Sequence, residues 1–351
     1  MIRKFTLFNL LILLLLAQSC ATRQNWYRGN THAHTVLCGH ADSAPDVVAK
    51  WYLDHGYNFV ILSEHNRFIN PDSVMLPDNR RSDFILIPGE EISGKKIIHT
   101  TAMNIRELAD WQFDSEQKSQ IIQSHVDNAM AAGGQAILNH PNYYYAASAA
   151  DVLQVQRLIM FELFNGHPQV NVWGDETHPS TEEMWDFWLS KGMKIFAVSS
   201  DDAHHFQTWG ADQSNPGRGW VMVNSQKLSP DAITDAMVRG EFYASNGVFL
   251  KRAQISEKQY LIEVDESRTA AELATGLVVG KSSPEGLSGW KIEFIGKEGE
   301  LLDSKNGTKA VFSLPDGQPF VRAKVTFTRP AESGFESFFA WIQPLFNDGR
   351  R

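Results

Sequence analysis

The chain has 351 residues, of which 43% are hydrophobic, and it carries a formal net charge of -9 at pH 7. That length and apolar content predict a large core and room for two domains. The acidic balance excludes the basic surface that is typical of nucleic-acid-binding proteins, so we expect no nucleic-acid partner.

The first residues predict a secretory signal rather than part of the fold. Arg3 and Lys4 precede an apolar run over residues 7–17, and small residues follow it up to Cys20. A basic start, a short apolar stretch and small residues at the break are typical of a signal peptide over residues 1–19. The segment also resembles a bacterial lipobox, which implies a lipidated Cys20.

This signal predicts a place in the bacterial cell envelope, lipid-anchored or periplasmic, with plain secretion as the alternative to lipidation. We expect membrane contact only through the lipid anchor, because no other segment approaches the length of a membrane span. Cys38 is the one other cysteine. With Cys20 acylated, the mature protein would have no internal disulfide, and its stability would come from core packing.

Residues 24–249 predict alternating strands and helices. Short apolar runs at 58–62, 84–87, 135–138, 158–161 and 194–198 have the composition of buried parallel strands. Helical patterns lie between them, for example one with Pro45 in its first turn and one behind a capping box of Ser180 with Glu183. Such repeated units predict an α/β fold with a parallel sheet, most economically closed into a barrel.

Residues 250–347 predict a small antiparallel β domain resembling a sandwich. Apolar and polar residues alternate here, as in Tyr260, Ile262 and Val264 and again in Val321, Ala323 and Val325. This period of two is typical of half-buried strands. The segment contains no histidine, and we expect no chemistry in it.

Seven histidines and two acids stand where strands of the first region should end. On an extended strand, residues two apart project to the same face, so His32 and His34 point one way, and Asp202 and His204 repeat the spacing. In barrels, functional residues gather at the carboxyl ends of the strands. Imidazoles and carboxylates from many segments are what a multinuclear metal site requires. A core histidine satisfied by hydrogen bonds is the alternative for any one of them. The set is His32, His34, His40, His65, Glu91, His99, His140, Asp202 and His204.

These motifs resemble the PHP (polymerase and histidinol phosphatase) domain family of metal-dependent hydrolases, over roughly residues 28 to 245. The matching stretches are His32-Ala33-His34, Cys38-Gly39-His40, Glu64-His65, Gly89-Glu90-Glu91, Asn139-His140-Pro141 and Asp202-Ala203-His204. With its lipobox and β tail, the chain is most similar to the carbaryl-hydrolase-like branch. The resemblance implies a distorted (β/α)7-type barrel.

The resemblance also implies a role for each ligand. One metal would be held by His32, His34, Glu91 and Asp202, and Glu91 would bridge to a second metal that His99 and His140 complete. His40, His65 and His204 would hold a third metal, and Glu90 is the alternative to Glu91. We therefore expect two or three divalent ions, of zinc, manganese or iron.

The predicted function is hydrolysis of a small-molecule ester by a metal-bridging hydroxide, with no side-chain nucleophile. A phosphoesterase is favoured. A carboxyl-ester or carbamate hydrolase on the same site is the first alternative, and a non-catalytic envelope binding protein is the second. His205 is a candidate proton donor, with a surface histidine as the alternative.

Further residues are candidates for supporting roles. Arg67 and Arg218 could grip an anionic substrate, with solvated surface as the alternative. Asn66, Asn139 and Asn165 could hold the second nitrogen of ligand histidines, or cap turns. Cys38 could bind metal, although a buried small residue is the favoured interpretation. Core or lid packing is likewise favoured over substrate stacking for Trp173, Trp209 and Trp220.

Overall fold

The structure is a computed structural model that describes residues 25–77, 82–256 and 258–347. The predicted signal peptide and Cys20 lie outside these residues. Among the described residues, no helix combines the length and the apolar character needed to cross a membrane.

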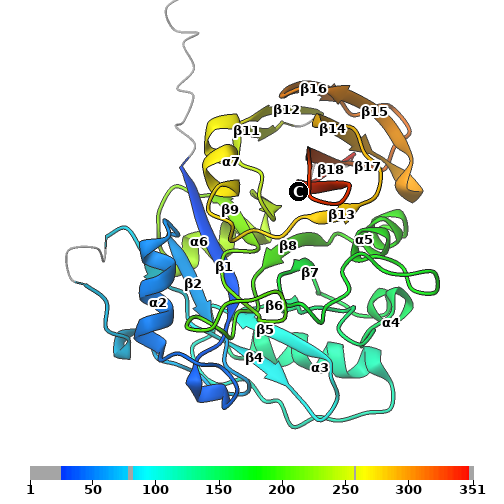
Figure 1. Ribbon diagram of the computed structural model, residues 1–351. Helices are drawn as coiled ribbons and strands as arrows, with labels where there is room; N and C mark the ends of the chain where they lie inside the picture. Colours follow the sequence, from blue (N-terminus) through cyan, green and yellow to red (C-terminus); the bar gives the residue numbers. More distant parts are fainter. Residues whose placement is uncertain (1–24, 78–81, 257, 348–351) are drawn as a thin grey trace, which may run out of the picture.

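The first region contains both strands and helices (Figure 1). Its strands are β1 (Trp26–Ala33), β2 (Phe59–Leu62), β3 (Ile85–Leu86), β4 (Gly89–Ser93), β5 (His99–Met103), β6 (Gln135–Leu138), β7 (Met160–Asn165), β8 (Phe196–Ser200), β9 (Trp220–Asn224) and β10 (Phe242–Ser245). Its helices are α2 (Pro45–Asp54), α3 (Lys118–Ala131), α4 (Ala149–Leu153), α5 (Thr181–Ser190) and α6 (Pro230–Val238), with 3-10 turns η1 (Val36–Cys38) and η2 (Pro71–Ser73). Strands alternate with helices from α3 to β8, whereas β2, β3, β4 and β5 follow one another without an α-helix.

Local sequence signals explain where these helices begin. Pro45 occupies the first turn of α2, where its missing N–H removes no helical hydrogen bond. Ser180 accepts the Glu183 amide while the Glu183 side chain accepts from Ser180, which is the predicted capping box of α5. The helices then pack on the strands: α2 on β2, α3 on β5 and β6, α5 on β7, and α6 on β9.

The strands form mixed sheets, which corrects the expectation of one parallel sheet. Strands β4 to β8 form a five-stranded sheet in chain order. Within it, β4–β5 and β5–β6 are antiparallel, whereas β6–β7 and β7–β8 are parallel. Five residues (94–98) connect β4 to β5, and a parallel pair needs a crossover of a dozen or more residues, so this connection permits only a hairpin.

The second sheet, of ten strands, runs β15-β14-β17-β18-β10-β9-β1-β2-β3, with β13 pairing β18. Two isolated bridges connect it to the five-stranded sheet. Ala33↔Ala203 joins the last residue of β1 to the segment after β8, and His65↔Glu91 joins the segment after β2 to β4. The amide of Asp202 donates to the carbonyl of His32 at 2.9 Å beside the first bridge. These links draw the ends of both sheets together at one place.

The C-terminal region consists mainly of antiparallel strands. They are β11 (Leu250–Ile255), β12 (Gln259–Val264), β13 (Lys281–Ser283), β14 (Gly289–Ile295), β15 (Leu301–Asn306), β16 (Lys309–Ser313), β17 (Phe320–Pro330) and β18 (Phe335–Phe346), with helix α7 (Glu266–Leu273) and turn η4 (Lys297–Gly299). Strands β11, β12 and β16 form a separate three-stranded sheet. The hydroxyl of Tyr260 in β12 donates to the carbonyls of Val321 and Gln343 at 2.6 and 2.7 Å, so this sheet lies against β17 and β18.

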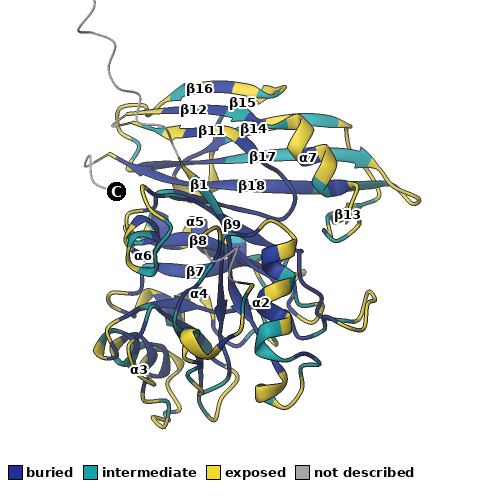
Figure 2. Cartoon of the chain, turned by 90° about the vertical axis from the view of Figure 1, so that its left-hand side faces the viewer, coloured by how far each residue is buried: buried dark blue, intermediate teal, exposed yellow. Residues whose placement is uncertain are grey.

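Strand β18 is buried on both faces and connects the two regions (Figure 2). Phe339 and Trp341 pack into a core built mostly by the first region, whereas Phe338 and Ala340 pack into a second core that α2, β2 and the C-terminal strands share. Strand β18 also pairs with β10. Strand pairing through β18 therefore joins the two regions in one sheet, although the sequence predicts a domain boundary between residues 249 and 250.

Candidate metal centre

Strands and the segments that follow them bring the predicted ligands to one place, where the two sheets approach each other, although Glu91 and His99 do not lie where a strand ends, which is where the sequence predicts them. His32 is the last but one residue of β1, and His34 follows that strand. Glu91 lies in the middle of β4, and His99 is the first residue of β5. His65, His140 and Asp202 follow β2, β6 and β8 within three residues. Ligands that come from six strands are fixed by the sheets and not by a mobile loop.

Five imidazole rings surround the carboxylate of Glu91, which is 1% exposed. Oε1 lies 3.3 Å from His32 Nε2, 3.1 Å from His99 Nδ1 and 3.3 Å from His140 Nε2, and Oε2 lies 3.4 Å from His34 Nε2 and 2.8 Å from His65 Nδ1. The two oxygens of Glu91 therefore face two different sets of nitrogens, as a bridging carboxylate does.

Asp202 forms a second centre beside the first. Its Oδ1 lies 3.3 Å from His32 Nε2, 3.4 Å from His34 Nε2 and 3.6 Å from His204 Nδ1. The nitrogens of His32 and His34 are themselves 3.1 Å apart. Both rings thus stand between the two carboxylates.

The ligand atoms fall into overlapping groups of three within 4.8 Å of one another. These groups are His32–His34–Glu91, His32–His140–Asp202, His65–Glu91–His99, His40–His65–His204 and His34–Cys38–His204. Every one of the nine predicted ligands belongs to at least one group. The structure thus brings the predicted set together.

The spacing of these atoms fits the ligands of a metal ion. Ligands about 2.0–2.1 Å from one metal ion lie roughly 3.0–3.4 Å from each other, which is the spacing around Glu91 and Asp202. Glu91 Oε2 is buried beside two imidazoles yet makes no hydrogen bond to any described residue. The same holds for His34 Nδ1, His140 Nδ1 and His204 Nε2. Imidazole and carboxylate atoms gathered at these distances suit a cation among them.

Burial and charge set opposite protonation states within the cluster. Burial opposes charging of His32, but the carboxylates of Asp202, Glu91 and Glu162 outweigh it and raise its pKa well above the usual value. Burial lowers the pKa of His34 to about 4, and burial together with His34 lowers the pKa of His204 well below the usual value. His34 and His204 are therefore neutral at pH 7, which is the form that binds a metal ion.

Two ligands and a neighbour hold backbone conformations that L-residues rarely adopt. The φ angles are +23° at His140, +50° at Asp202 and +51° at Asn66. Each such residue costs about 1–3 kcal/mol, and they cluster at functional sites where the surrounding structure holds them. The backbone N–H of Asp202 donates a hydrogen bond to the carbonyl of His32, which holds Asp202 in this conformation.

Glu162 supports the cluster and is a residue that the sequence analysis did not single out. It is 1% exposed and accepts from His32 Nδ1 at 2.9 Å, from the His140 amide at 2.8 Å and from Asn165 Nδ2 at 2.8 Å. It thereby fixes the tautomer of His32, leaving Nε2 for a metal. The one available signal was an acid inside the apolar strand Met160-Phe161-Glu162-Leu163-Phe164.

The three candidate asparagines differ in what they hold. Asn139 donates to Glu91 Oε1 at 2.9 Å, and Asn165 donates to Asp202 Oδ2 at 3.3 Å. Both therefore position the carboxylates rather than the imidazoles. Asn66 exchanges hydrogen bonds with the backbone of Ser93, whose hydroxyl lies 2.7 Å from His65 Nδ1.

Adjacent residues Glu90 and Glu91 project to opposite faces of β4. Glu90 accepts the amide of Ala109 at 2.5 Å, and its burial raises its pKa to about 7. It lies in the core, away from the histidines. The structure thus presents Glu91, and not Glu90, to the cluster.

The candidate substrate arginines lie in different surroundings. Arg218 is buried, and its guanidinium donates to the carbonyls of Gly166 and Gly210 at 2.9 and 3.1 Å. These bonds hold the loop after β8 and favour a structural role over the predicted substrate-binding one. Arg67 is exposed, two residues beyond His65.

His205 and the three tryptophans lie as follows. Nδ1 of His205 accepts the amide of Ser214, and its ring centre lies 6.5 Å from that of His204. Trp220 is fully buried, Trp173 packs against the core, and Trp209 is exposed. The buried position of Trp220 is the core packing that the sequence analysis favours.

Two tyrosines, unnoticed in the sequence, stand beside the cluster. The ring of Tyr143 lies 5.2 Å from that of His140 and 4.7 Å from that of Tyr144. Tyr144 is 64% exposed and has a φ of +46°. We call Tyr143 and Tyr144 the tyrosine pair. Its signal in the sequence was the run Tyr143-Tyr144-Tyr145 just after His140-Pro141.

No family model matches the chain, and no curated protein matches it. Solved structures similar to it include a two-domain protein from Bacteroides vulgatus described as containing a predicted PHP-like metal-dependent phosphoesterase. That similarity has a TM-score of 0.46 and 14% sequence identity, and covers 90% of this chain and 95% of that chain.

Proposed function

We propose that this chain is a metal-dependent hydrolase that cleaves phosphate esters. The observation that carries the proposal is the cluster itself: nine predicted ligand residues lie together, two carboxylates each face several imidazoles, and buried ring nitrogens lack a hydrogen-bond partner among the described residues. Two or three divalent ions of zinc, manganese or iron suit these donors. Ions bound here would lower the pKa of a water molecule to near neutrality and polarise the ester.

The fold supports the same proposal. The bridges Ala33↔Ala203 and His65↔Glu91 connect β1 to β8 and β2 to β4. Followed through these bridges, strands β1, β2, β4, β5, β6, β7 and β8 form a ring. We infer that this ring is the distorted barrel that the resemblance to the PHP family implies, with the cluster at one end.

The residues of the chain divide the work of the reaction. Glu162 orients His32, and Asn139 and Asn165 orient Glu91 and Asp202. His205 remains the proposed proton donor. It would donate from its protonated form, so the hydrogen bond that Nδ1 accepts from the Ser214 amide would open when the ring takes up its second proton. The tyrosine pair would contact the organic part of the ester.

Charge favours a phosphate ester over a carboxyl or carbamate ester. Glu91, Asp202 and the adjoining Glu162 contribute three negative charges, so three divalent ions would leave the cluster with a net positive charge even with one hydroxide bound. Such a field attracts an anionic substrate more than a neutral one. The place of action that we propose, the bacterial envelope, rests on residues 1–20 alone.

The test measures metal content and two activities on the same protein. Elemental analysis should find two to three transition ions per chain, and metal-loaded protein should cleave p-nitrophenyl phosphate faster than p-nitrophenyl acetate or an aryl carbamate. The H32A variant should lose turnover and metal while keeping its circular dichroism. The exposed-histidine variant H55A should match the wild type.

Each outcome decides between the candidate functions. Ester or carbamate cleavage without phosphatase activity would move the proposal to the carboxyl-ester alternative. Metal-loaded protein that cleaves none of these probes would leave the non-catalytic alternative. Unchanged turnover in H32A would separate the activity from the metal cluster and overturn the proposal.

A further inference from the structure

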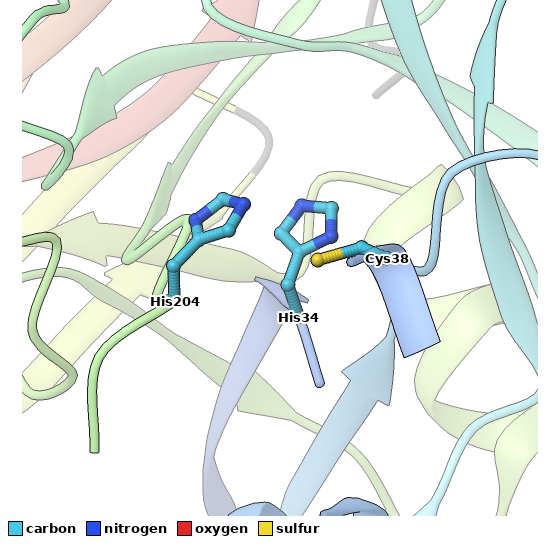
Figure 3. A group of neighbouring side chains, drawn as sticks. All are labelled: His34, Cys38 and His204. Atoms are coloured by element: carbon cyan, nitrogen blue, oxygen red, sulfur yellow. The ribbon is translucent and has the colours of Figure 1, made fainter. Parts of the chain in front are cut away.

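A thiol stands at one corner of the cluster. After β1 the chain turns through η1, which Thr35 caps and which Gly39 ends with a φ of +86°. This turn brings Cys38 back toward His34, which the chain has just left. Figure 3 shows the sulfur of Cys38 beside the ring of His34, with the ring of His204 on the other side.

Two buried nitrogens accompany this thiol. The ligand atoms of His34, Cys38 and His204 lie within 4.8 Å of one another. His34 is fully buried and His204 is 6% exposed, and their rings stack with centres 4.2 Å apart. His34 Nδ1 and His204 Nε2 make no hydrogen bond to any described residue. His204 Nδ1 lies 3.0 Å from the carbonyl of Asp202, which leaves Nε2 as its free ligand atom.

We propose that His34, Cys38 and His204 form a sulfur-containing cation position that takes a thiophilic divalent ion such as zinc, cobalt or cadmium. We call it the sulfur corner. Two imidazoles and one thiolate are a ligand set for such ions, and the thiol proton passes to solvent when the ion binds. A tetrahedral site places sulfur and nitrogen about 3.6 Å apart, so a small movement of Cys38 on its turn closes the site.

The sulfur corner shares His204 with the His40–His65–His204 group and His34 with the His32–His34–Glu91 group. With His34 Nε2 on an ion of the main cluster, a second ion on Nδ1 would displace the remaining ring proton, which passes to solvent with the thiol proton. Since Nε2 of His204 can serve only one ion at a time, the sulfur corner and the His40–His65–His204 position exclude each other. Thiolate prefers soft ions, whereas imidazole and carboxylate also accept manganese. The identity of the third ion should therefore decide which of Cys38 and His40 is a ligand. This inference depends on the proposed metal centre but not on the ester that it cleaves.

Cobalt reports directly on sulfur ligation. Wild-type protein loaded with Co²⁺ should show the intense near-ultraviolet charge-transfer absorption of a thiolate–cobalt bond, besides the weak visible bands of the other cobalt ions. The C38S variant should lose the ultraviolet absorption and keep the visible bands. The matched variant C20S should keep both.

A second measurement needs no variant at position 38. Zn²⁺ or Cd²⁺ should slow alkylation of Cys38 by iodoacetamide at least tenfold, and Mn²⁺ should not. Bound cobalt without sulfur absorption, or equal protection by all three ions, would overturn the sulfur corner alone. Protein that binds no cobalt at all would overturn the metal centre with it.

Discussion

The histidine cluster and the ion-pair cluster between α5 and β17 are both buried and charged, but their groups are partnered differently. Arg322 donates to both carboxylate oxygens of Asp186 at 2.6 and 2.7 Å and to Glu182 at 2.9 Å, and Lys324 donates to Glu182 at 2.7 Å. Each charge there has a fixed opposite charge. The histidine cluster keeps unpartnered nitrogens and residues at positive φ.

This difference separates a structural joint from a binding site. The ion-pair cluster connects the C-terminal strands to α5 and is complete without any added group. The histidine cluster has ligand atoms without a partner among the described residues, and bound ions would supply that partner. Changes to the ion-pair cluster should lower the stability of the protein, whereas changes to the histidine cluster should weaken metal binding. The two losses can be compared as free energies, because a tenfold change in affinity equals about 1.4 kcal/mol.

The largest effect should follow from R322M. The substitution leaves Glu182 and Asp186 buried without their main partner, which should lower the free energy of unfolding by about 3–5 kcal/mol. Urea unfolding measures this loss. Metal content should stay at the wild-type value, and the partly exposed pair Arg329–Glu336 supplies the control, R329M, with a loss below about 1 kcal/mol. A smaller loss in R322M than in R329M would contradict the comparison.

The ion-pair cluster of Arg322 and Glu182 also predicts that the stability of the protein depends on pH. Burial would raise the pKa of Glu182, but Arg322 and Lys324 outweigh it and lower that pKa to about 2. The stabilisation is therefore complete above the unfolded value of about 4.3 and is lost as the pH falls toward 2. The stability difference between wild type and R322M should shrink over that interval in urea titrations. A difference that grows there would assign the stabilisation to another group.

The next effect should follow from E91Q. An amide cannot bridge two cations as a carboxylate does, and changes that only touch a ligand's partner already cost about 10–100-fold. We expect at least a hundredfold loss of metal affinity, measured by competition with a chelator, at near wild-type stability. E90Q makes the same change on the opposite face of β4, where the raised pKa of Glu90 makes the amide a close substitute. Equal losses in both variants would contradict the assignment of Glu91.

A smaller effect should follow from E162Q. Glu162 accepts four hydrogen bonds, from His32, the His140 amide, Asn165 and Ser200. The amide nitrogen that E162Q introduces is itself a hydrogen-bond donor and cannot accept from these groups. His32 then loses the hydrogen bond that fixes its tautomer. We expect a loss of about 10–100-fold in metal affinity. E183Q, at the exposed capping box of α5, should bind metal as the wild type does, and a wild-type affinity in E162Q would remove its positioning role.

The apolar runs before the ligands explain how much of this site the sequence could predict. Strands β2, β6 and β8 form at the apolar runs 58–62, 135–138 and 194–198. Each strand is followed within a few residues by a predicted ligand. The signal is local, because a buried parallel strand is apolar throughout. The role of Glu162 could not be predicted, because its partner His32 is 130 positions away in the sequence. No local pattern relates an acid in one strand to an imidazole in another.

The mixed sheets and strand β18 escaped for a related reason. Strands β4 and β5, Gly89–Ser93 and His99–Met103, are short and polar, and their antiparallel pairing depends on contacts that periodicity does not record. Strand β18 is apolar on both faces because it lies between two cores, so it lacks the alternation of Val321, Ala323 and Val325. Burial on one face can be predicted from alternation, whereas burial on two faces depends on the neighbour.

The smallest effect should follow from Y144A in the tyrosine pair. Aromatic stacking contributes about 0.5–1.5 kcal/mol, so KM for p-nitrophenyl phosphate should rise roughly 2- to 12-fold at unchanged kcat. Alanine also carries a Cβ, so the backbone at φ +46° is equally strained in both proteins. For a small alkyl phosphate, which offers no ring, KM should not change. F187A on α5 removes an exposed ring far from the ligands and should leave both KM values as they are. A loss in kcat, or equal losses for both esters, would mean that Tyr144 supports His140 and not the substrate.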